Sequence, residues 1–270
     1  MRRMIRTLVL AGILAGATRR PLLSQSRPAA VDASRTSIGV SVGETVGGML
    51  WSVGDQAVED DAIHTDTLAL SRRFTTGVSA AAHYTHFASA HFGVTVEATY
   101  LGLATSDGCS VLHDSGDANI ATACSEFHGT TVSSGGAFTL TGGVVWRIAM
   151  GGTLQPYLKA AAGIFTLNAN PVEVTVGHQT AGNNVYAVYT DRGWSSVRPT
   201  GVLAGGISTA ANSGFQVHLE ARESFVGLPT IIGTNPLQGD PARIRSTTKG
   251  FLSILAGVDL VLKRNRGRRY

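Results

Sequence analysis

Several stretches of the chain alternate between apolar and polar residues. In residues 215–224 (FQVHLEARES) every second side chain from Phe215 to Ala221 is apolar, and those between them are polar. Successive side chains of a strand point to opposite faces, so the pattern predicts a strand with one apolar and one polar face. An apolar face that points inward belongs to a soluble barrel or sandwich, whereas one that points outward belongs in a membrane.

The same alternation recurs along the chain and predicts an all-β fold of eight strands. The predicted strands span residues 36–51, 67–86, 91–105, 131–148, 155–169, 198–210, 215–226 and 247–263. An additional hairpin is expected between residues 172 and 190 around TAGNN, because Asn and Gly suit a tight turn.

The connections between these strands alternate in length. Three are tight turns, FASA, AMGGTLQ and ANSG, and the others are long polar segments. We therefore predict an eight-stranded antiparallel up-and-down transmembrane β-barrel with short periplasmic turns and long extracellular loops. The segments have the roughly 9–11 residues that a tilted strand needs to cross a bilayer.

Aromatic residues gather beside the short turns and predict an interfacial girdle. They are Tyr84, Phe87, Phe92, Trp146, Tyr157 and Phe215. The alternative is that these rings close the core of a soluble barrel, but that arrangement would scatter them along the strands.

An outward apolar face places six charged side chains inside the barrel. They are Glu97, Arg147, Lys159, Glu220, Arg222 and Asp259. An eight-stranded barrel is just wide enough for side chains to fill it, so we expect paired charges to plug the lumen. The acid beside Arg222 is expected to be Glu220 or Glu97. A narrow gated pore is the alternative.

At this point the chain resembles the small eight-stranded outer-membrane β-barrel domain family of Gram-negative bacteria. The resemblance covers residues 34–263 and rests on this architecture and on LQPYLKAAAGI and GFLSILAGVDLVL. It implies the cell outer membrane as location, lipid as surroundings and the barrel-assembly machinery as a partner during biogenesis. Members usually end at the final strand with an aromatic residue, whereas Tyr270 here follows the basic run KRNRGRR in a tail over 264–270.

The composition of the two ends of the chain indicates an export signal and argues against a nucleic-acid partner. Residues 1–25 have the basic start, short apolar core and small residues of a signal peptide, with cleavage expected between 17 and 30. The alternative is a disordered basic N-terminus of a cytoplasmic protein. The five arginines of residues 1–25 and five cations of residues 263–270 turn the net charge of +4 into −6 for residues 26–262, so no nucleic-acid partner is expected.

The two cysteines, Cys109 and Cys124, lie in one long polar connection. An oxidising compartment permits a disulfide between them. A metal site is the alternative, but it requires more ligands at closer spacing.

No residue pattern points to a cofactor or to catalysis. His83, His86 and His91 bracket a tight turn, with His83 expected to point inward and the other two to lie near the interface. We interpret them as solvated turn histidines, with a metal site as the alternative. His218, Glu220 and Ser224 share one face of a strand, as a lipid A-modifying enzyme would require, but that face points into the lumen.

We therefore expect a monomer with a structural role or an extracellular ligand bound through its long loops. A narrow pore, a lipid A-modifying enzyme and a soluble lipocalin-like carrier are the alternatives.

Overall fold

The structure of the protein is a computed structural model that describes the strands and the connections closest to them. The described residues are 36–59, 65–113, 124, 132–133, 135–148, 154–168, 172–177, 185–191, 195–209, 214–235 and 240–262. The predicted signal peptide and basic tail lie outside these residues. Among the described residues, no helix is long and apolar enough to cross a membrane.

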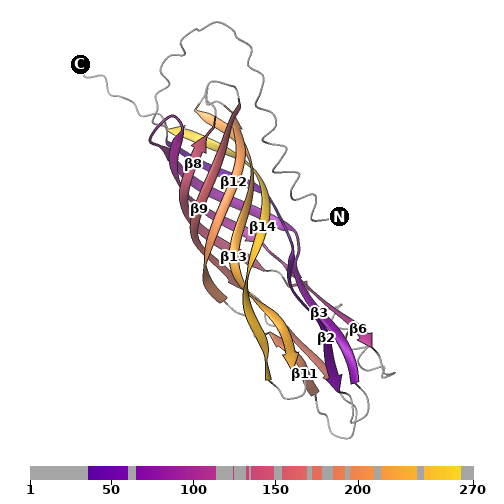
Figure 1. The fold of residues 1–270 in the computed structure, drawn as a ribbon. Coiled ribbons are helices and arrows are strands. Elements are labelled where there is room, and N and C mark those ends of the chain that lie inside the picture. The colour runs from indigo at the N-terminus through magenta and orange to yellow at the C-terminus, as the bar shows by residue number, and fades with distance from the viewer. Residues whose placement is uncertain are drawn as a thin grey trace, which may run out of the picture. The chain divides into compact units, whose positions relative to one another are not determined.

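Eight antiparallel strands close into a barrel, which confirms the predicted fold class. In barrel order they are β1 (Thr36–Val46), β14 (Asp240–Leu262), β13 (Phe215–Asn235), β12 (Ser195–Thr209), β9 (Leu154–Asn168), β8 (Gly136–Arg147), β5 (Phe92–Gly102) and β4 (Gly77–Phe87). Each barrel strand pairs with the next one along the chain, and β1 pairs with both β14 and β4. The sheet therefore has no free edge within the barrel (Figure 1).

Two predicted strands are each divided between the barrel and a second sheet. The strand predicted over 36–51 ends at Val46, and the strand predicted over 67–86 breaks after Phe74. The chain approaches itself closely here, since a Cβ on Gly47 would meet the backbone of Phe74 and the amide of Phe74 donates to the carbonyl of Gly48. Both breaks fall inside segments that were each predicted as one strand, so the sequence pattern does not reveal the change of partner.

The segments beyond these breaks form a separate four-stranded sheet. Its strands are β2 (Met49–Glu59), β3 (Thr65–Phe74), β6 (Thr105–His113) and β7 (Val132–Ser133), in that order. The long connections at this end, which were predicted as polar loops, are therefore partly folded.

A separate hairpin and an extension of two barrel strands complete the architecture. The predicted hairpin is present as β10 (Val172–Gly177) and β11 (Val185–Asp191). The connection expected between 226 and 247 is instead mostly strand, because β13 and β14 stay paired as far as Asn235 and Asp240 (Figure 1). The register shifts near Gly233, so the pairing there is irregular.

One apolar cluster joins the barrel interior to the four-stranded sheet. It comprises Leu50, Trp51, Val53, Leu68, Leu70, Phe74, Leu101, Leu103, Cys109, Cys124, Ala137, Phe165, Leu167, Val226, Leu228, Ile231 and Phe251. At its centre the ring of Phe251 meets Phe74 edge to face at 5.3 Å and stacks on Phe165 at 6.1 Å. The interior of the barrel is therefore filled by apolar side chains at the end of the long connections.

Candidate functional site

The outward face of the barrel is apolar and its inward face is polar. On β13 the side chains of Phe215, Val217 and Leu219 are 56%, 55% and 49% exposed. The neighbouring Glu220 and Arg222 are only 4% and 3% exposed. A soluble barrel would have the opposite arrangement, because water favours charged groups on the outside.

The apolar outer face continues around all eight strands. Exposed side chains on it include Ile38, Val40, Val42, Val78, Val94, Val96, Leu140, Val144, Leu158, Ile164, Leu203, Ile207, Ile254, Val258 and Leu260. Such a band on a closed barrel is the surface that hydrocarbon chains cover. The protein is an eight-stranded outer-membrane β-barrel. The short turns of such barrels face the periplasm, so the four-stranded sheet lies on the extracellular side.

An aromatic girdle borders this band on the periplasmic side. Phe92 stacks on Trp146, with ring centroids 6.2 Å apart, and both rings are exposed. Tyr84 and Phe215 are also exposed near the short turns. These four rings have the position of an interfacial girdle.

Two rings predicted for this girdle lie in the lumen instead. Phe87 is only 4% exposed and packs under the guanidinium of Arg147, whose Cζ lies 3.5 Å from the ring centroid. Tyr157 donates a hydrogen bond of 2.9 Å to the inward Glu220. Their assignment to the girdle was wrong. The alternation itself indicates the inward position of Tyr157, because Tyr157 is two residues from the inward Lys159 and therefore shares its face of the strand.

Four of the six predicted lumen charges form one ion-pair network. It contains Glu97 on β5, Lys159 on β9, and Glu220 and Arg222 on β13. Lys159 Nζ lies 2.8 Å from Glu97 Oε2 and 2.7 Å from Glu220 Oε1. Arg222 pairs with both acids as well, contacting Glu97 through Nη1 and Glu220 through Nη2 at 2.8 Å. Each acid therefore contacts both cations.

Neutral hydroxyl donors complete the hydrogen bonding of these four charged residues, which we call the lumen network. Tyr157 reaches Oε2 of Glu220, and the hydroxyl of Thr99 donates to Glu97 at 3.1 Å. All four charged side chains are at most 7% exposed. Buried charges are tolerated when they are paired and hydrogen-bonded, and here two acids balance two cations. The network links three strands across the interior.

The remaining two predicted charges lie nearer the periplasmic mouth. Asp259 on β14 contacts His83 and His218, while Arg147 on β8 covers Phe87. The structure thus places all six predicted charges inside, but it brings only four of them together.

The three histidines that bracket the first short turn do not converge. His83 points inward to Asp259. His86 Nδ1 instead lies 2.9 Å from the hydroxyl of Thr36, and the exposed His91 contacts the carbonyl of Arg147 through Nδ1 at 3.0 Å. These three residues therefore form no shared site.

A small open space lies in the periplasmic half of the lumen. A cavity of about 50 Å³ adjoins the lumen network and is lined by Arg147, Tyr157, Gln216, His218 and Asp259 among others. On the extracellular side of the network the buried Leu101, Phe165 and Phe251 occupy the interior. The network therefore lies between a small cavity on one side and packed apolar side chains on the other.

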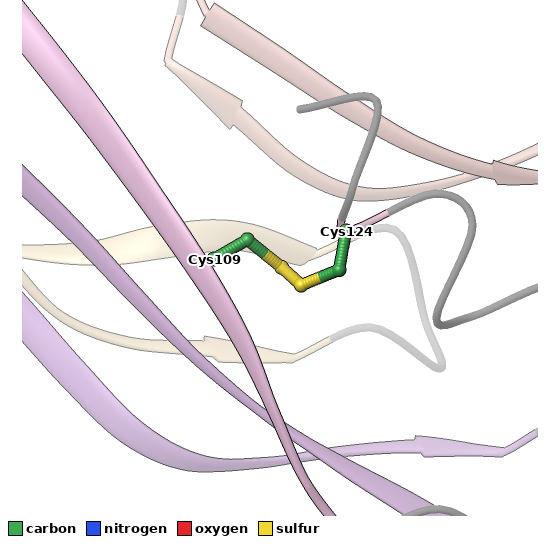
Figure 2. The surroundings of a disulfide bond; sticks show 2 residues. All are labelled: Cys109 and Cys124. Carbon is green, nitrogen blue, oxygen red and sulfur yellow. A yellow bond between two sulfur atoms is a disulfide. The ribbon is translucent and has the colours of Figure 1, made fainter. Parts of the chain in front are cut away.

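The extracellular sheet has its own covalent and ionic links. Cys109 on β6 is joined to Cys124 in a disulfide (Figure 2). Arg72 on β3 lies opposite Asp107 on β6 and contacts it twice, at 2.6 Å and 3.1 Å, with both side chains buried. The sequence analysis missed this pair because Asp107 falls in the long connection predicted after the strand over 91–105.

Solved structures with a similar chain path are outer-membrane proteins, although the similarity is low. A scan against protein-family models finds no match, and neither does a search of the curated proteins. Neisserial surface protein A (NspA) has 8% identity and a TM-score of 0.39, over 83% of this chain and 96% of that chain. Outer membrane protein AlkL has 10% identity and a TM-score of 0.43, over 92% and 99%.

A third similar structure is Ail, the attachment invasion locus protein of Yersinia pestis, in complex with the heparin analogue sucrose octasulfate. It has 9% identity and a TM-score of 0.34, over 84% of this chain and 99% of that chain. Likenesses at this level of identity and TM-score do not transfer function.

Proposed function

We propose that the protein is a monomeric, non-conducting and non-catalytic barrel that anchors a folded extracellular surface in outer-membrane lipid. It would reach the membrane through the barrel-assembly machinery. Its extracellular end would bind a ligand outside the cell. No nucleic acid is expected among its partners.

The filled lumen is the observation that carries the non-conducting role. The ion-pair network links β5, β9 and β13, and apolar side chains fill the interior beyond it. A continuous water path would need both layers to open together. Eight-stranded barrels of this kind are packed inside instead of hollow.

The positions of the candidate catalytic groups favour a non-catalytic role. Glu220 accepts from Lys159, Arg222 and Tyr157, so both of its oxygens are occupied. His218 contacts Asp259 instead of Ser224. At about 3.3 Å per residue, Ser224 lies roughly 20 Å along the strand from His218, too far for a shared proton transfer.

The extracellular end has the properties of a binding surface. Its sheet is held by the disulfide and by the buried Arg72–Asp107 pair, so its outer side chains are presented on a fixed framework. Met49, Leu112 and Ile232 are 54%, 53% and 58% exposed there. Connections positioned by a rigid scaffold are where binding residues concentrate.

Three measurements test this proposal. In planar bilayers the purified protein should give no stepwise conductance, whereas a general porin run in parallel should; regular current steps would establish the pore. Expression should leave the mass of lipid A unchanged, and a shift by one acyl chain would establish the enzyme. Binding to immobilised glycans and matrix proteins should fall when the disulfide is reduced and alkylated, and equal binding after reduction would contradict a role for this sheet.

A further inference from the structure

Three metal-ligating side chains from three different strands converge in the periplasmic half of the lumen. They are His83 on β4, His218 on β13 and Asp259 on β14, and one donor atom of each lies within 4.8 Å of the others. His83 Nε2 is 2.9 Å from Asp259 Oδ1, and His218 Nδ1 is 3.3 Å from Asp259 Oδ2. All three side chains are at most 13% exposed.

Two glycines create the room for this convergence. Gly39 on β1 lies opposite both His83 and Asp259, and a Cβ there would run into both side chains. Gly257 on β14 lies opposite His218, and a Cβ there would meet its ring. A larger residue at either position would push the ligands apart, because glycine alone lets side chains cross the backbone so closely.

The hydrogen bonding of this cluster is incomplete. Among the described residues, His218 Nδ1, Asp259 Oδ1 and the neighbouring Gln216 Nε2 are buried and have no hydrogen-bond partner. The contact between His83 and Asp259 has the length of an ion pair but not the alignment of a hydrogen bond, since Asp259 Oδ1 is among these atoms. Buried polar atoms nearly always have a partner, so the cluster needs an additional group.

We propose that His83, His218 and Asp259 bind a divalent transition-metal ion, with Zn²⁺ as the best match. Zinc takes imidazole nitrogen and carboxylate oxygen at about 2.0–2.2 Å in a tetrahedral arrangement, which sets neighbouring ligand atoms about 3.3 Å apart. Two of the separations, 2.9 Å and 3.3 Å, are close to that value, and each reaches a different oxygen of Asp259. The three donor atoms as a set lie within 4.8 Å of one another, so the side chains have to draw together to close around the ion.

The adjoining cavity supplies the fourth position. It touches His83, His218 and Asp259, and its volume of about 50 Å³ holds a water molecule as a fourth ligand. Arg147 also lines this cavity, and its positive charge opposes a cation there. We therefore expect affinity in the micromolar range instead of the tighter binding of closed structural zinc sites.

Zinc binding by the refolded full-length barrel tests this proposal. The protein is refolded in detergent with a chelator, dialysed, and titrated with ZnCl₂ by calorimetry at neutral pH. CoCl₂ serves as the optical probe, because tetrahedral Co²⁺ absorbs strongly in the visible range. We expect one ion per barrel and a tetrahedral cobalt spectrum. Absence of uptake at micromolar zinc would overturn the proposal.

Variants locate the ion within the barrel. His218→Ala and Asp259→Asn should each weaken binding by about 10-fold or more, since even indirect supports of a metal ligand contribute that much. His86→Ala is the matched control, because His86 lies on the same strand as His83 but bonds Thr36 instead. Each variant is first shown to be folded by its heat-modifiable migration. If folded His218→Ala and Asp259→Asn bind zinc as well as His86→Ala does, the ion lies elsewhere and the proposal fails.

Discussion

Replacing Arg222 by leucine tests the lumen network at a cation that contacts both of its acids. Arg222 contacts both Glu97 and Glu220, and it also donates to the hydroxyl of Thr99 at 3.0 Å. The substitution removes one of two cations and leaves Lys159 alone between two acids, so the four-residue network changes from neutral to a net charge of −1.

The expected cost follows from the number of ion pairs lost. At an effective dielectric constant of about 20 and a charge separation of about 4 Å, each pair contributes about 4 kcal/mol of attraction. Arg222 makes two such pairs, and the desolvation of its own charge offsets part of their sum. We therefore expect Arg222→Leu to lower the free energy of unfolding by about 3–5 kcal/mol, the usual cost of breaking a buried pair.

A second substitution shows whether charge is the cause. Adding Glu97→Gln to Arg222→Leu leaves Lys159 paired with Glu220, and it should recover about 1–3 kcal/mol of the loss. The matched control adds Asp259→Asn to Arg222→Leu. Asp259 is also a lumen acid, but it contacts His83 and His218 instead of this network, so its replacement should not recover the stability lost with Arg222. The measurement is urea unfolding from lipid vesicles for the single and double variants. Strict additivity of Arg222→Leu and Glu97→Gln would refute the network as described.

Three further predictions concern the outer face and the extracellular sheet. Leu219→Arg should cost about 2–4 kcal/mol near the bilayer midplane, without rescue by any lumen substitution; an unchanged urea midpoint would contradict its outward position. Alkylation of the exported protein without reductant should label no cysteine, and two labelled thiols by mass would contradict the disulfide between Cys109 and Cys124. Arg72→Met should remove the buried contact with Asp107 and open the sheet to limited proteolysis while the barrel keeps its heat-modifiable migration; wild-type resistance to the protease would show that the pair is dispensable.

The sequence predicts the barrel well because its main signal is local. Alternation fixes which face each side chain takes, and the outward Leu219 and inward Arg222 follow directly from it. Phe87 and Tyr157 were wrongly assigned to the girdle because both lie close to a short turn. Their positions in the alternation of each strand place them on the inward face.

Contacts across the lumen depend on information that no single strand contains. Glu97 and Arg222 are 125 residues apart and come from different strands. Which inward residues meet depends on the tilt and register of all eight strands together. For the same reason alternation predicts that His83, His218 and Asp259 face inward, but it does not predict that they converge.

The extracellular sheet was missed for a different physical reason. Only two residues separate the end of β3 at Phe74 from the start of β4 at Gly77, so the pattern of this segment cannot show where the chain leaves one sheet and joins another. The break depends on the close approach of Gly47 to the backbone of Phe74, which is a tertiary contact.

The depth of Leu219 in the bilayer can be measured with a single tryptophan at that position. Trp51, Trp146 and Trp194 are replaced by phenylalanine, and Leu219→Trp is added to the protein refolded in vesicles. Lipids brominated along their acyl chains should quench its fluorescence strongly, and aqueous acrylamide should quench it weakly, because the side chain at position 219 faces hydrocarbon. Strong quenching by acrylamide with none by brominated lipid would place that face in water and contradict the outer-membrane barrel.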